Sequence, residues 1–346
     1  MIRCRMEHSM KIREYKKEDE GQIKEALKSI SGIDSEQWCW KFFGNPNRDS
    51  QIWIIDEDGI LIGHMALICM KLRVNGSDVD GCQAVDLFID KNHRGKGLFV
   101  SLGKTILENA GEIGISVAFG FPNHEALGGH LKYGWKNIGT IQRGLKPLDI
   151  KQFAKMNKKS PLTMSIYMGI KSRKKKIPIN EFTVTHIHEF DKSIDSFVSK
   201  NLKYRNAVLR TSNYLNWRYC QAPHRDYIKF LATDKNGVVG YIVGSETKKA
   251  PGIGYIVDIF VKEGDIIAAR TLLETLEKYY KSKKIFALHA WIPNFREYEV
   301  AFKDSGFIQR KPTQPFIVRV NREFIDMDYV FDIDKWFITM GDSDLH

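Results

Sequence analysis

The chain has 346 residues, of which 43% are hydrophobic and 27% charged. This is the composition of a globular protein long enough for two domains with separate cores. No apolar run approaches the roughly 20 residues of a membrane-spanning helix, and Met1–Glu7 lacks the apolar stretch of a signal peptide. Five cysteines show no CxxC pair or metal-ligand spacing, so we expect a cytoplasmic protein with no membrane partner and no metal.

The net charge of +11 raises the question of a nucleic-acid partner. Lys and Arg are spread along the chain among 42 acidic residues, and the one dense basic run, Lys171–Lys176, is typical of a solvated connector. We therefore expect no nucleic acid. A basic surface would equally attract CoA or an anionic acceptor such as a nucleotide-linked sugar.

The first elements in chain order are strands. Lys11–Tyr15 predicts an opening strand, and Ile55–Gly63 predicts two strands joined by a tight turn in which Gly59 takes a positive φ. Strands alternate with helical segments along the rest of the chain, which favours an α/β fold with a mixed sheet.

The most informative segment is Asp86–Leu98, an apolar strand followed by a basic turn that contains Gly95 and Gly97. Glycines at a helix start let backbone N–H groups approach a phosphate closely, and the helix dipole favours the anion. Arg94 and Lys96 add positive charge, so a diphosphate-bearing cofactor is predicted here. The helix that follows has an apolar face made of Leu98, Phe99, Leu102, Ile106 and Leu107.

The spacing of this turn fits neither a P-loop, since no Gly-Lys-Ser/Thr follows, nor a GxGxxG dinucleotide fingerprint. Arg94–Phe99 instead resembles motif A of the GNAT superfamily of acyl-CoA N-acyltransferases, whose pattern Arg/Gln-x-x-Gly-x-Gly/Ala follows a strand. The family's second segment, Asn-x-x-Ala…Lys-x-Gly-aromatic, is matched downstream by Asn123, Ala126, Lys132, Gly134 and Trp135.

The resemblance implies acetyl-CoA as the acyl donor. The family splays two adjacent parallel strands, and the pantetheine arm of CoA inserts between them. By resemblance, this arm would receive backbone hydrogen bonds from Leu87, Phe88 and Ile89, and Asn123 would contact the cofactor through its side-chain amide. The pyrophosphate would be held by the N–H groups of the turn formed by Arg94, Gly95, Lys96, Gly97, Leu98 and Phe99.

Two positions depart from the family pattern. Phe99 replaces a small residue, so the turn is intact if the ring enters the helix–sheet core and CoA is blocked if the ring faces the phosphates. His130 stands where the family often has a Tyr that protonates the leaving thiolate. An imidazole with a pKa of about 6.5 could do this; alternatively His130 is a partly exposed helix histidine.

The second half of the chain repeats the first. Trp40–Pro46 matches Trp217–Pro223 with the same spacing, and Val85–Ile89 returns as Val257–Val261. Further matches pair Ile55–Gly63 with Thr233–Gly240, Phe121–Asn123 with Ile292–Asn294, and Gly134–Trp135 with Gly306–Phe307. Matches in the same order over this distance indicate an internal duplication.

The second copy lacks the cofactor chemistry. Its turn, Lys262–Asp265, has acidic residues where the first copy has Arg94 and Lys96, and Phe302 replaces His130. We expect this copy to brace the first and to supply one wall of the acceptor cleft.

The repeat leaves the general base open. Asp86 lies on the cofactor strand and is a candidate, but Asp258 occupies the same position in the second copy, which favours a structural role such as pairing across the sheet. His124 and Glu125 are further candidates, and the proton could also leave along a chain of water.

The predicted fold class is α/β, with two tandem GNAT-like domains, each a mixed, mostly antiparallel twisted sheet flanked by helices. The predicted segments are a catalytic domain at 10–147, a connector at 148–180, a degenerate domain at 181–320, and a C-terminal tail at 321–346 that packs on a domain.

The predicted function is acetyl-CoA-dependent N-acetylation of a small amine, such as an amino sugar attached to a nucleotide, by direct attack in a ternary complex. The alternatives are a non-catalytic acyl-CoA-binding or regulatory module and an aminoacyl-tRNA-dependent aminoacyl transferase. The sequence leaves the acceptor, the acyl length and the oligomeric state undetermined.

Overall fold

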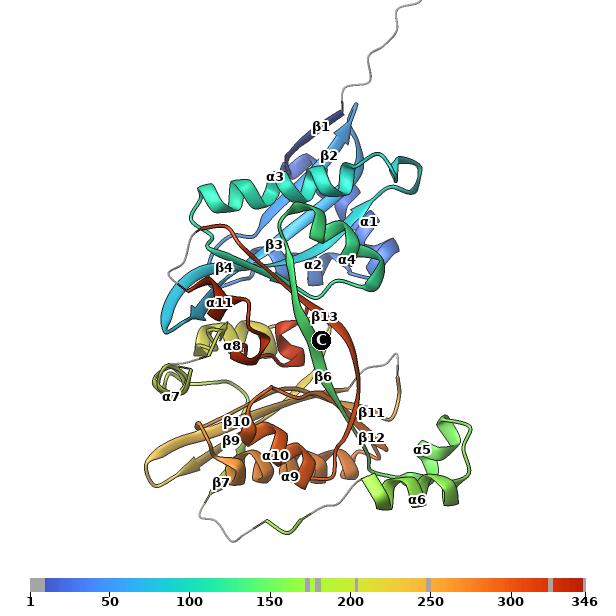
Figure 1. The fold of residues 1–346 in the computed structure, drawn as a ribbon, viewed down its shortest axis with the longest axis vertical. Helices are drawn as coiled ribbons and strands as arrows, with labels where there is room; N and C mark the ends of the chain where they lie inside the picture. The colour runs from blue at the N-terminus through green and yellow to red at the C-terminus, as the bar shows by residue number, and fades with distance from the viewer. Residues whose placement is uncertain are drawn as a thin grey trace, which may run out of the picture. The chain divides into compact units, whose positions relative to one another are not determined.

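The computed structural model describes residues 10–171, 175–177, 182–202, 205–246, 250–322 and 326–344. The chain forms two compact units, whose elements are labelled in Figure 1. Unit 1 comprises the residues up to Leu72, Asp78–Gly139 and Pro315–Met327, and unit 2 comprises Arg73–Ser77, Thr140–Gln314 and the residues from Asp328 on.

Unit 1 is built on a mixed, mostly antiparallel sheet with the strand order β1-β2-β3-β4-β5-β13. β4 and β5 are parallel, whereas β5 and β13 are antiparallel, as are β1 and β2 and also β2 and β3. These strands are β1 (Met10–Glu14), β2 (Gln51–Glu57), β3 (Ile60–Val74), β4 (Ser77–Ile89), β5 (Val117–Gly120) and β13 (Ile308–Val320).

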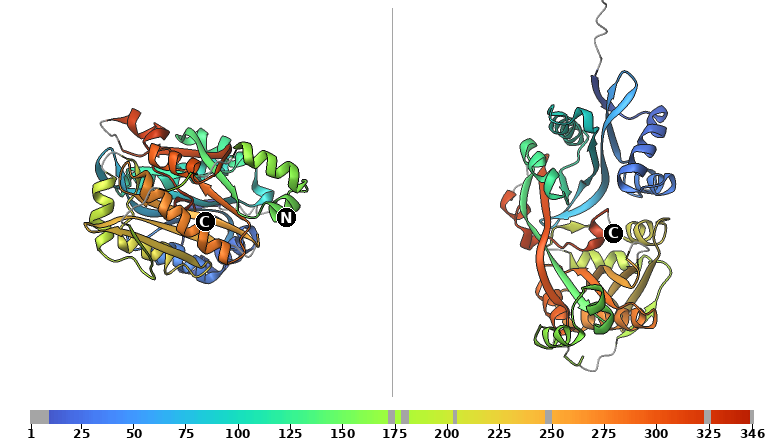
Figure 2. Two further views of the ribbon diagram at one scale, coloured as in Figure 1. Left: turned by 90° about the horizontal axis from the view of Figure 1, so that it is seen from below. Right: turned by 90° about the vertical axis from the view of Figure 1, so that its right-hand side faces the viewer.

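Helices cover both faces of this sheet, with α1 and α2 on one face and α3 on the other (Figure 2, right). The predicted apolar face of α3 is confirmed, because Leu102, Ile106 and Leu107 are fully buried and Leu98 and Phe99 pack at the edge of the same core. The helical segments are η1 (Lys17–Asp19), α1 (Glu20–Ser31), α2 (Ser35–Phe43), η2 (Lys91–His93), α3 (Leu98–Glu112), α4 (His124–His130) and η3 (Leu131–Tyr133).

Unit 2 has the corresponding strand order β7-β9-β10-β11-β12-β6, again with a parallel pair, β11 and β12, next to the last strand. Its strands are β6 (Lys136–Pro147), β7 (Thr183–His186), β8 (Ala207–Val208), β9 (Tyr227–Asp234), β10 (Gly237–Glu246), β11 (Ile253–Val261) and β12 (Ala287–Trp291). Its helical segments are α5 (Ile150–Met156), α6 (Pro161–Lys171), α7 (Ser193–Asn201), α8 (Ser212–Tyr219), α9 (Ile266–Ser282), α10 (Arg296–Asp304), α11 (Met327–Val330), η4 (Ile333–Lys335) and η5 (Met340–Asp342).

The last strand of each sheet comes from the other half of the sequence. In unit 1, Ile317–Val320 of β13 pairs with Val117–Gly120, and in unit 2, Arg143–Pro147 of β6 pairs with Ala287–Trp291. Each sheet therefore takes its last strand from outside the consecutive segments predicted above, 10–147 and 181–320. Unit 2 also contains Arg73–Ser77, the predicted connector and the tail from Asp328 on.

The predicted fold class, a mixed and mostly antiparallel α/β sheet flanked by helices, is confirmed. The predicted turn glycine, Gly59, has a positive φ of 85°, and Gly237, in the matching segment Thr233–Gly240, has a φ of 118°. The tail contributes buried Trp336 and Phe337, which belong to unit 2. Parts of the predicted segments lie outside the described residues, namely residues 1–9 with Cys4, residues 172–174 of the basic run, and residues 178–181, 203, 204, 247–249, 323–325, 345 and 346.

The core of unit 1 depends on a residue from the C-terminal strand, because Ile317 is fully buried within its main cluster. We expect Ile317→Ala to destabilise unit 1 by about 2–5 kcal/mol, the usual range for truncating a buried Ile. Urea denaturation followed by near-UV circular dichroism measures this change. Lys311→Ala, on an exposed part of the same strand, is the control, and equal stability of the two variants would contradict this account of the core.

Candidate active site

A glycine-containing turn connects β4 to α3. Gly95 and Gly97 both have φ of 79°, and an added Cβ at either would meet no atom within 4 Å. Gly97 is the N-cap of α3 and offers no side-chain cap, so N–H groups of the first helical turn have no acceptor inside the helix. The turn is thus open to an anion, which the positive end of the helix dipole would attract.

Side chains around the turn supply positive charge and hold the turn in place. Arg94 and Lys96 are exposed, and Arg94 Nε donates to the carbonyl oxygen of Ile89 at 3.3 Å. His93 bridges two carboxylates, with Nδ1 at 3.0 Å from Asp90 and Nε2 at 3.0 Å from Glu57 on β2. This bracing histidine was not singled out from the sequence, because its partner Glu57 is distant in the chain.

Phe99 points away from the turn. Its ring packs edge-on against His130, with centroids 5.2 Å apart, and also contacts Tyr133. A Cβ at Gly129 on α4 would lie 2.5 Å from Phe99 Cε1, so Gly129 makes the room for this ring. The large residue at the end of the motif therefore enters the packing between α3 and α4 and leaves the phosphate side of the turn open.

β4 and β5 separate just before the turn. Their parallel pairing covers Gly81–Gln83 and Val117–Phe119, but β4 continues to Ile89. At its end β4 is still attached to β3, since Asp90 N–H donates to the carbonyl of Ile62 at 2.7 Å. The predicted cofactor-binding residues Leu87, Phe88 and Ile89 lie in this separated stretch, where the edge toward β5 is available to an extended chain.

Asp86 begins that stretch with a strained backbone. Its φ is 50°, and the other non-glycine residues with positive φ among the described residues, such as Asp58 and Asn75, lie in turns. A non-glycine residue in this region costs about 1–3 kcal/mol and persists where the surroundings fix it. Its carboxylate forms a 2.7 Å ion pair with Lys41 Nζ, and both side chains are buried.

His64 on β3 holds the other end of Asp86. Its Nδ1 lies 2.8 Å from the carbonyl oxygen of Asp86, and because a carbonyl only accepts, Nδ1 carries the proton. The ring is fully buried, which lowers its pKa, and it stacks on Phe88 with centroids 5.6 Å apart. Nε2 has no hydrogen-bond partner among the described residues.

The two candidate catalytic residues thus lie in different surroundings. Asp86 is paired with a cation and adjoins the separated strands. His130 is buried among Phe99, Tyr133 and Trp135, and desolvation lowers its pKa to about 4. This lowered pKa disfavours a protonated imidazole near neutral pH, because burial penalises the charged form. The role of His130 as proton donor stays a prediction.

Asn123 lies between β5 and α4 and acts as the N-cap of α4. Its side-chain oxygen accepts a hydrogen bond from the N–H of Ala126 at 2.8 Å. A cofactor contact through this amide would thus use the NH2 group, and that contact remains a prediction. His124 and Glu125, the further base candidates, begin α4 beside it.

Residues 11–138 match the family model described as "Acetyltransferase (GNAT) domain", and this segment contains the Arg94–Phe99 turn, the separated strand and Asn123. Residues 11–138 are thus similar in sequence to a GNAT acetyltransferase domain. No curated protein matches the chain significantly in sequence.

Solved structures share the fold over most of the chain. A probable N-acyltransferase from Enterococcus faecalis has 12% identity and a TM-score of 0.62, covering 90% of this chain and 72% of that one. A GCN5-related N-acetyltransferase from Anabaena variabilis has 14% identity and a TM-score of 0.62, covering 91% and 73%. An N-myristoyltransferase from Saccharomyces cerevisiae, solved with bound myristoyl-CoA and inhibitors, has 13% identity and a TM-score of 0.58, covering 90% and 80%.

The GNAT domain supports acyl-CoA-dependent N-acyltransfer, and the predicted family resemblance is confirmed. Among the described residues, no group of three or more His, Cys, Asp and Glu side chains is arranged to hold a metal ion. Within the same residues, every helix is too short or too polar to cross a membrane.

The corresponding turn of unit 2 is already capped by a carboxylate. Gly264 has φ of 76°, but the N-cap of α9 is Asp265, whose side chain accepts a hydrogen bond from the N–H of Ala268 at 2.8 Å. Glu263 adds a second negative charge. A phosphate would have to displace the one carboxylate and approach the other, so this turn is unsuited to a pyrophosphate.

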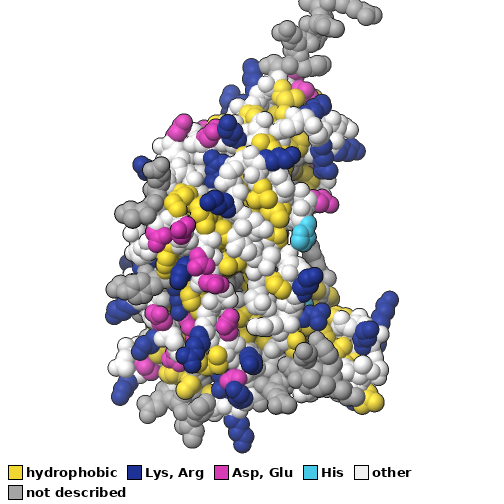
Figure 3. Space-filling view, viewed as in Figure 1, with side chains coloured by type: hydrophobic (Ala, Val, Ile, Leu, Met, Phe, Trp, Pro, Cys, Tyr) yellow, Lys and Arg dark blue, Asp and Glu magenta, His cyan; other side chains and the backbone are white. Residues whose placement is uncertain are grey.

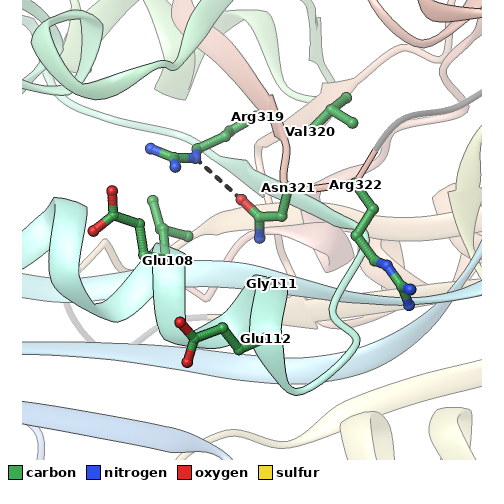
Figure 4. Close-up of a pocket in the computed structure, with 8 residues that line it drawn as sticks. Glu108, Gly111, Glu112, Arg319, Val320, Asn321 and Arg322 are labelled. Atoms are coloured by element: carbon green, nitrogen blue, oxygen red, sulfur yellow. Dashed lines mark hydrogen bonds between the residues drawn. The ribbon is translucent and has the colours of Figure 1, made fainter.

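A separate pocket of about 570 Å³ lies at the C-terminal end of α3, far from the phosphate turn (Figure 4). Its lining has both signs of charge, with Glu108 and Glu112 on α3 and Arg319 and Arg322 opposite. Since a helix C-terminus repels anions, this pocket is a poor site for the diphosphate of CoA.

The depressed pKa of His130 predicts a pH-dependent stability. Because the unfolded chain binds this proton near pH 6.5 and the folded protein only near 4, the contribution is present above about pH 6.5 and lost as the pH falls toward 4. Between about pH 7 and about pH 5 we expect the wild type to lose about 2 kcal/mol more stability than His130→Phe. Urea denaturation at both pH values measures this, and equal losses would contradict it.

Proposed function

We propose that the GNAT domain transfers the acetyl group of acetyl-CoA to the primary amine of a small acceptor, by direct attack within a ternary complex. The observation that carries this proposal is the adjacency of the open turn at Gly95–Gly97 to the separated end of β4. The turn would accept a diphosphate, and the separated end of β4 would accept an extended arm that contains amide groups. CoA carries a diphosphate followed by such an arm, the pantetheine.

The chain's own residues would bind the cofactor mainly through backbone groups. The N–H groups of the turn from Arg94 to Phe99 would hold the pyrophosphate, with Arg94 and Lys96 adding positive charge. Leu87, Phe88 and Ile89 would form strand-like hydrogen bonds with the pantetheine arm, and Asn123 would donate from its side-chain NH2. Acyl-CoA supplies an acyl group activated as a thioester.

The reaction forms a bond between the acceptor nitrogen and the acyl carbon, breaks the carbon–sulfur bond, and moves one proton off nitrogen and one onto sulfur. Asp86 is held by Lys41 at 2.7 Å, and His130 is buried with a pKa of about 4. These surroundings favour binding and positioning over proton transfer for both residues. We propose that water carries the protons and that the acceptor reacts as the neutral amine.

The acceptor is proposed from charge alone. The chain carries a net charge of +11, although Lys and Arg are interspersed with Asp and Glu on the face shown in Figure 3. An anionic small amine, such as an amino sugar linked to a nucleotide, would be attracted by this excess. No membrane or nucleic-acid partner forms part of the proposal.

Two other functions lead to different results. A non-catalytic acyl-CoA-binding module would bind the cofactor but release no thiol with any amine. An aminoacyl-tRNA-dependent transferase would copurify with RNA and would not need the turn. The intact turn at Arg94–Gly97, together with its open geometry, favours acyl-CoA over the second of these.

Cofactor binding is tested by titration calorimetry with acetyl-CoA. We expect the wild type to bind in the micromolar range and Gly97→Glu to abolish binding, because a carboxylate would occupy the phosphate position. Gly264→Glu is the matched control, since Gly264 has φ of 76° against 79° at Gly97 and both have open space around the Cβ position.

Loss of binding in both variants, or in neither, would contradict the assignment of the cofactor to the turn of unit 1. Absence of binding to the wild type would overturn the acyl-CoA function itself.

Catalysis is tested with a panel of amino sugars, nucleotide-linked amino sugars, polyamines and amino acids. We expect thiol release from acetyl-CoA to rise with one class of amine and the product mass to increase by one acetyl group, detected by mass spectrometry. The rate should fall at lower pH as the acceptor amine becomes protonated. No thiol release with any amine, despite cofactor binding, would favour the non-catalytic module.

A further inference from the structure

The peptide group between Asp86 and Leu87 is held from two sides by residues outside the turn. We propose that His64 and Lys41 are positioning residues that fix this peptide, so that the N–H of Leu87 is presented to the thioester carbonyl of bound acyl-CoA. The proposal rests on the proposed function, since it assigns a task to two residues around that site.

His64 fixes the carbonyl end of the peptide. Its Nδ1–H donates to the Asp86 oxygen at 2.8 Å from the α2 side of the sheet, where the ring also meets Phe42. In a trans peptide the C=O and N–H bonds point in opposite directions. Holding the oxygen toward His64 therefore turns the Leu87 N–H away from it and out of the ordinary ladder with β3.

Lys41 fixes the side chain of Asp86. Its ammonium lies 2.7 Å from the Asp86 carboxylate with both side chains buried, at 3% and 6% exposure. Lys41 lies on α2, which also buries Trp38 and Phe42, and its ammonium is 5.4 Å from the centroid of the Phe42 ring. With carbonyl and carboxylate both bound, Asp86 is held at a φ of 50° that a free strand residue would leave.

Unit 2 supplies an internal comparison. Asp258 corresponds to Asp86, and Tyr241, which follows Gly240 as His64 follows Gly63, corresponds to His64. Tyr241 donates to the carboxylate of Asp258 at 2.9 Å, and Asp258 has no positive φ. β11 also has a register shift beside Asp258, opposite Val243 and Gly244. The positive φ and the histidine-bound carbonyl occur together at Asp86, in the unit whose helix N-terminus is open to a phosphate.

The unpaired ring nitrogen of His64 also supports a positioning role. Nε2 is buried without a partner among the described residues, an arrangement that costs stability. If position 64 were needed only for packing, an apolar residue of similar shape would be more stable there than a histidine. What the imidazole adds is the Nδ1 hydrogen bond to the Asp86 carbonyl.

The Leu87 N–H would then be a fixed donor near the end of the separated strand. A donor already aimed at the acyl oxygen stabilises the negative charge that develops there, without reorganising during the reaction. Removing one such donor in other acyl-transfer enzymes lowers kcat by about 100- to 1000-fold. Loss of positioning alone should lower it by less, about 10- to 100-fold.

The test uses variants that separate the two ring nitrogens. His64→Asn places an amide donor near the Nδ1 position, whereas His64→Gln places its amide near Nε2 and His64→Leu removes both. The full-length proteins are mixed with acetyl-CoA carrying an isotope label at the thioester carbonyl, and the carbonyl stretch is recorded by difference infrared spectroscopy. Thiol release is measured on the same samples, and circular dichroism checks folding.

We expect His64→Leu and His64→Gln to bind acetyl-CoA with near-wild-type affinity, to shift the bound carbonyl to higher frequency, and to lower kcat by about 10- to 100-fold with little change in KM. His64→Asn should retain most of the wild-type frequency and rate. Tyr241→Phe in unit 2 is the control and should change neither.

A wild-type carbonyl frequency and kcat in folded His64→Gln would overturn the proposal. So would an Asn variant as impaired as the Gln variant, because Nε2 and not Nδ1 would then be the atom that matters. If the wild type fails to bind acetyl-CoA, the proposed function fails first, and that result differs from a wild type that binds and responds to no substitution.

Discussion

The separation of β4 from β5 is the feature on which the candidate site depends. β4 stays bonded to β3 up to Asp90, while its pairing with β5 ends at Gln83. The backbone groups left without a strand partner must be satisfied by something else. An extended chain that carries amide groups meets this need, and the helix N-terminus at Gly97 receives the charged end of the same molecule.

Both ends of the separated stretch are held by side chains from elsewhere in unit 1. At the start, Lys41 and His64 bind Asp86 through its carboxylate and its carbonyl. At the end, His93 joins Asp90 to Glu57. These contacts fix a strained strand and an exposed turn before any ligand arrives, which reduces the ordering that binding would otherwise require.

The two units use one strand order with different polar chemistry. In unit 1 the helix after the parallel strand begins at a bare glycine, whereas in unit 2 it begins at Asp265, whose carboxylate caps it. Asp258 is bound by Arg210, Tyr219 and Tyr241 in a fully buried cluster. Unit 2 therefore caps internally the helix N-terminus that unit 1 leaves open, which fits a structural role.

The sequence by itself determined the features that depend on spacing over a few residues: the Arg94–Phe99 turn, the apolar face of α3, and the repeated strand pattern. Only the tertiary structure decided which strand completes each sheet, because β6 and β13 are both long strands able to pair antiparallel with a neighbour. It also decided that His130 is buried, which lowers the pKa of its imidazole. The partners of Asp86 needed the fold as well, since Lys41 lies 45 residues away and His64 lies 22 residues away, distances over which local sequence patterns carry no information about contact.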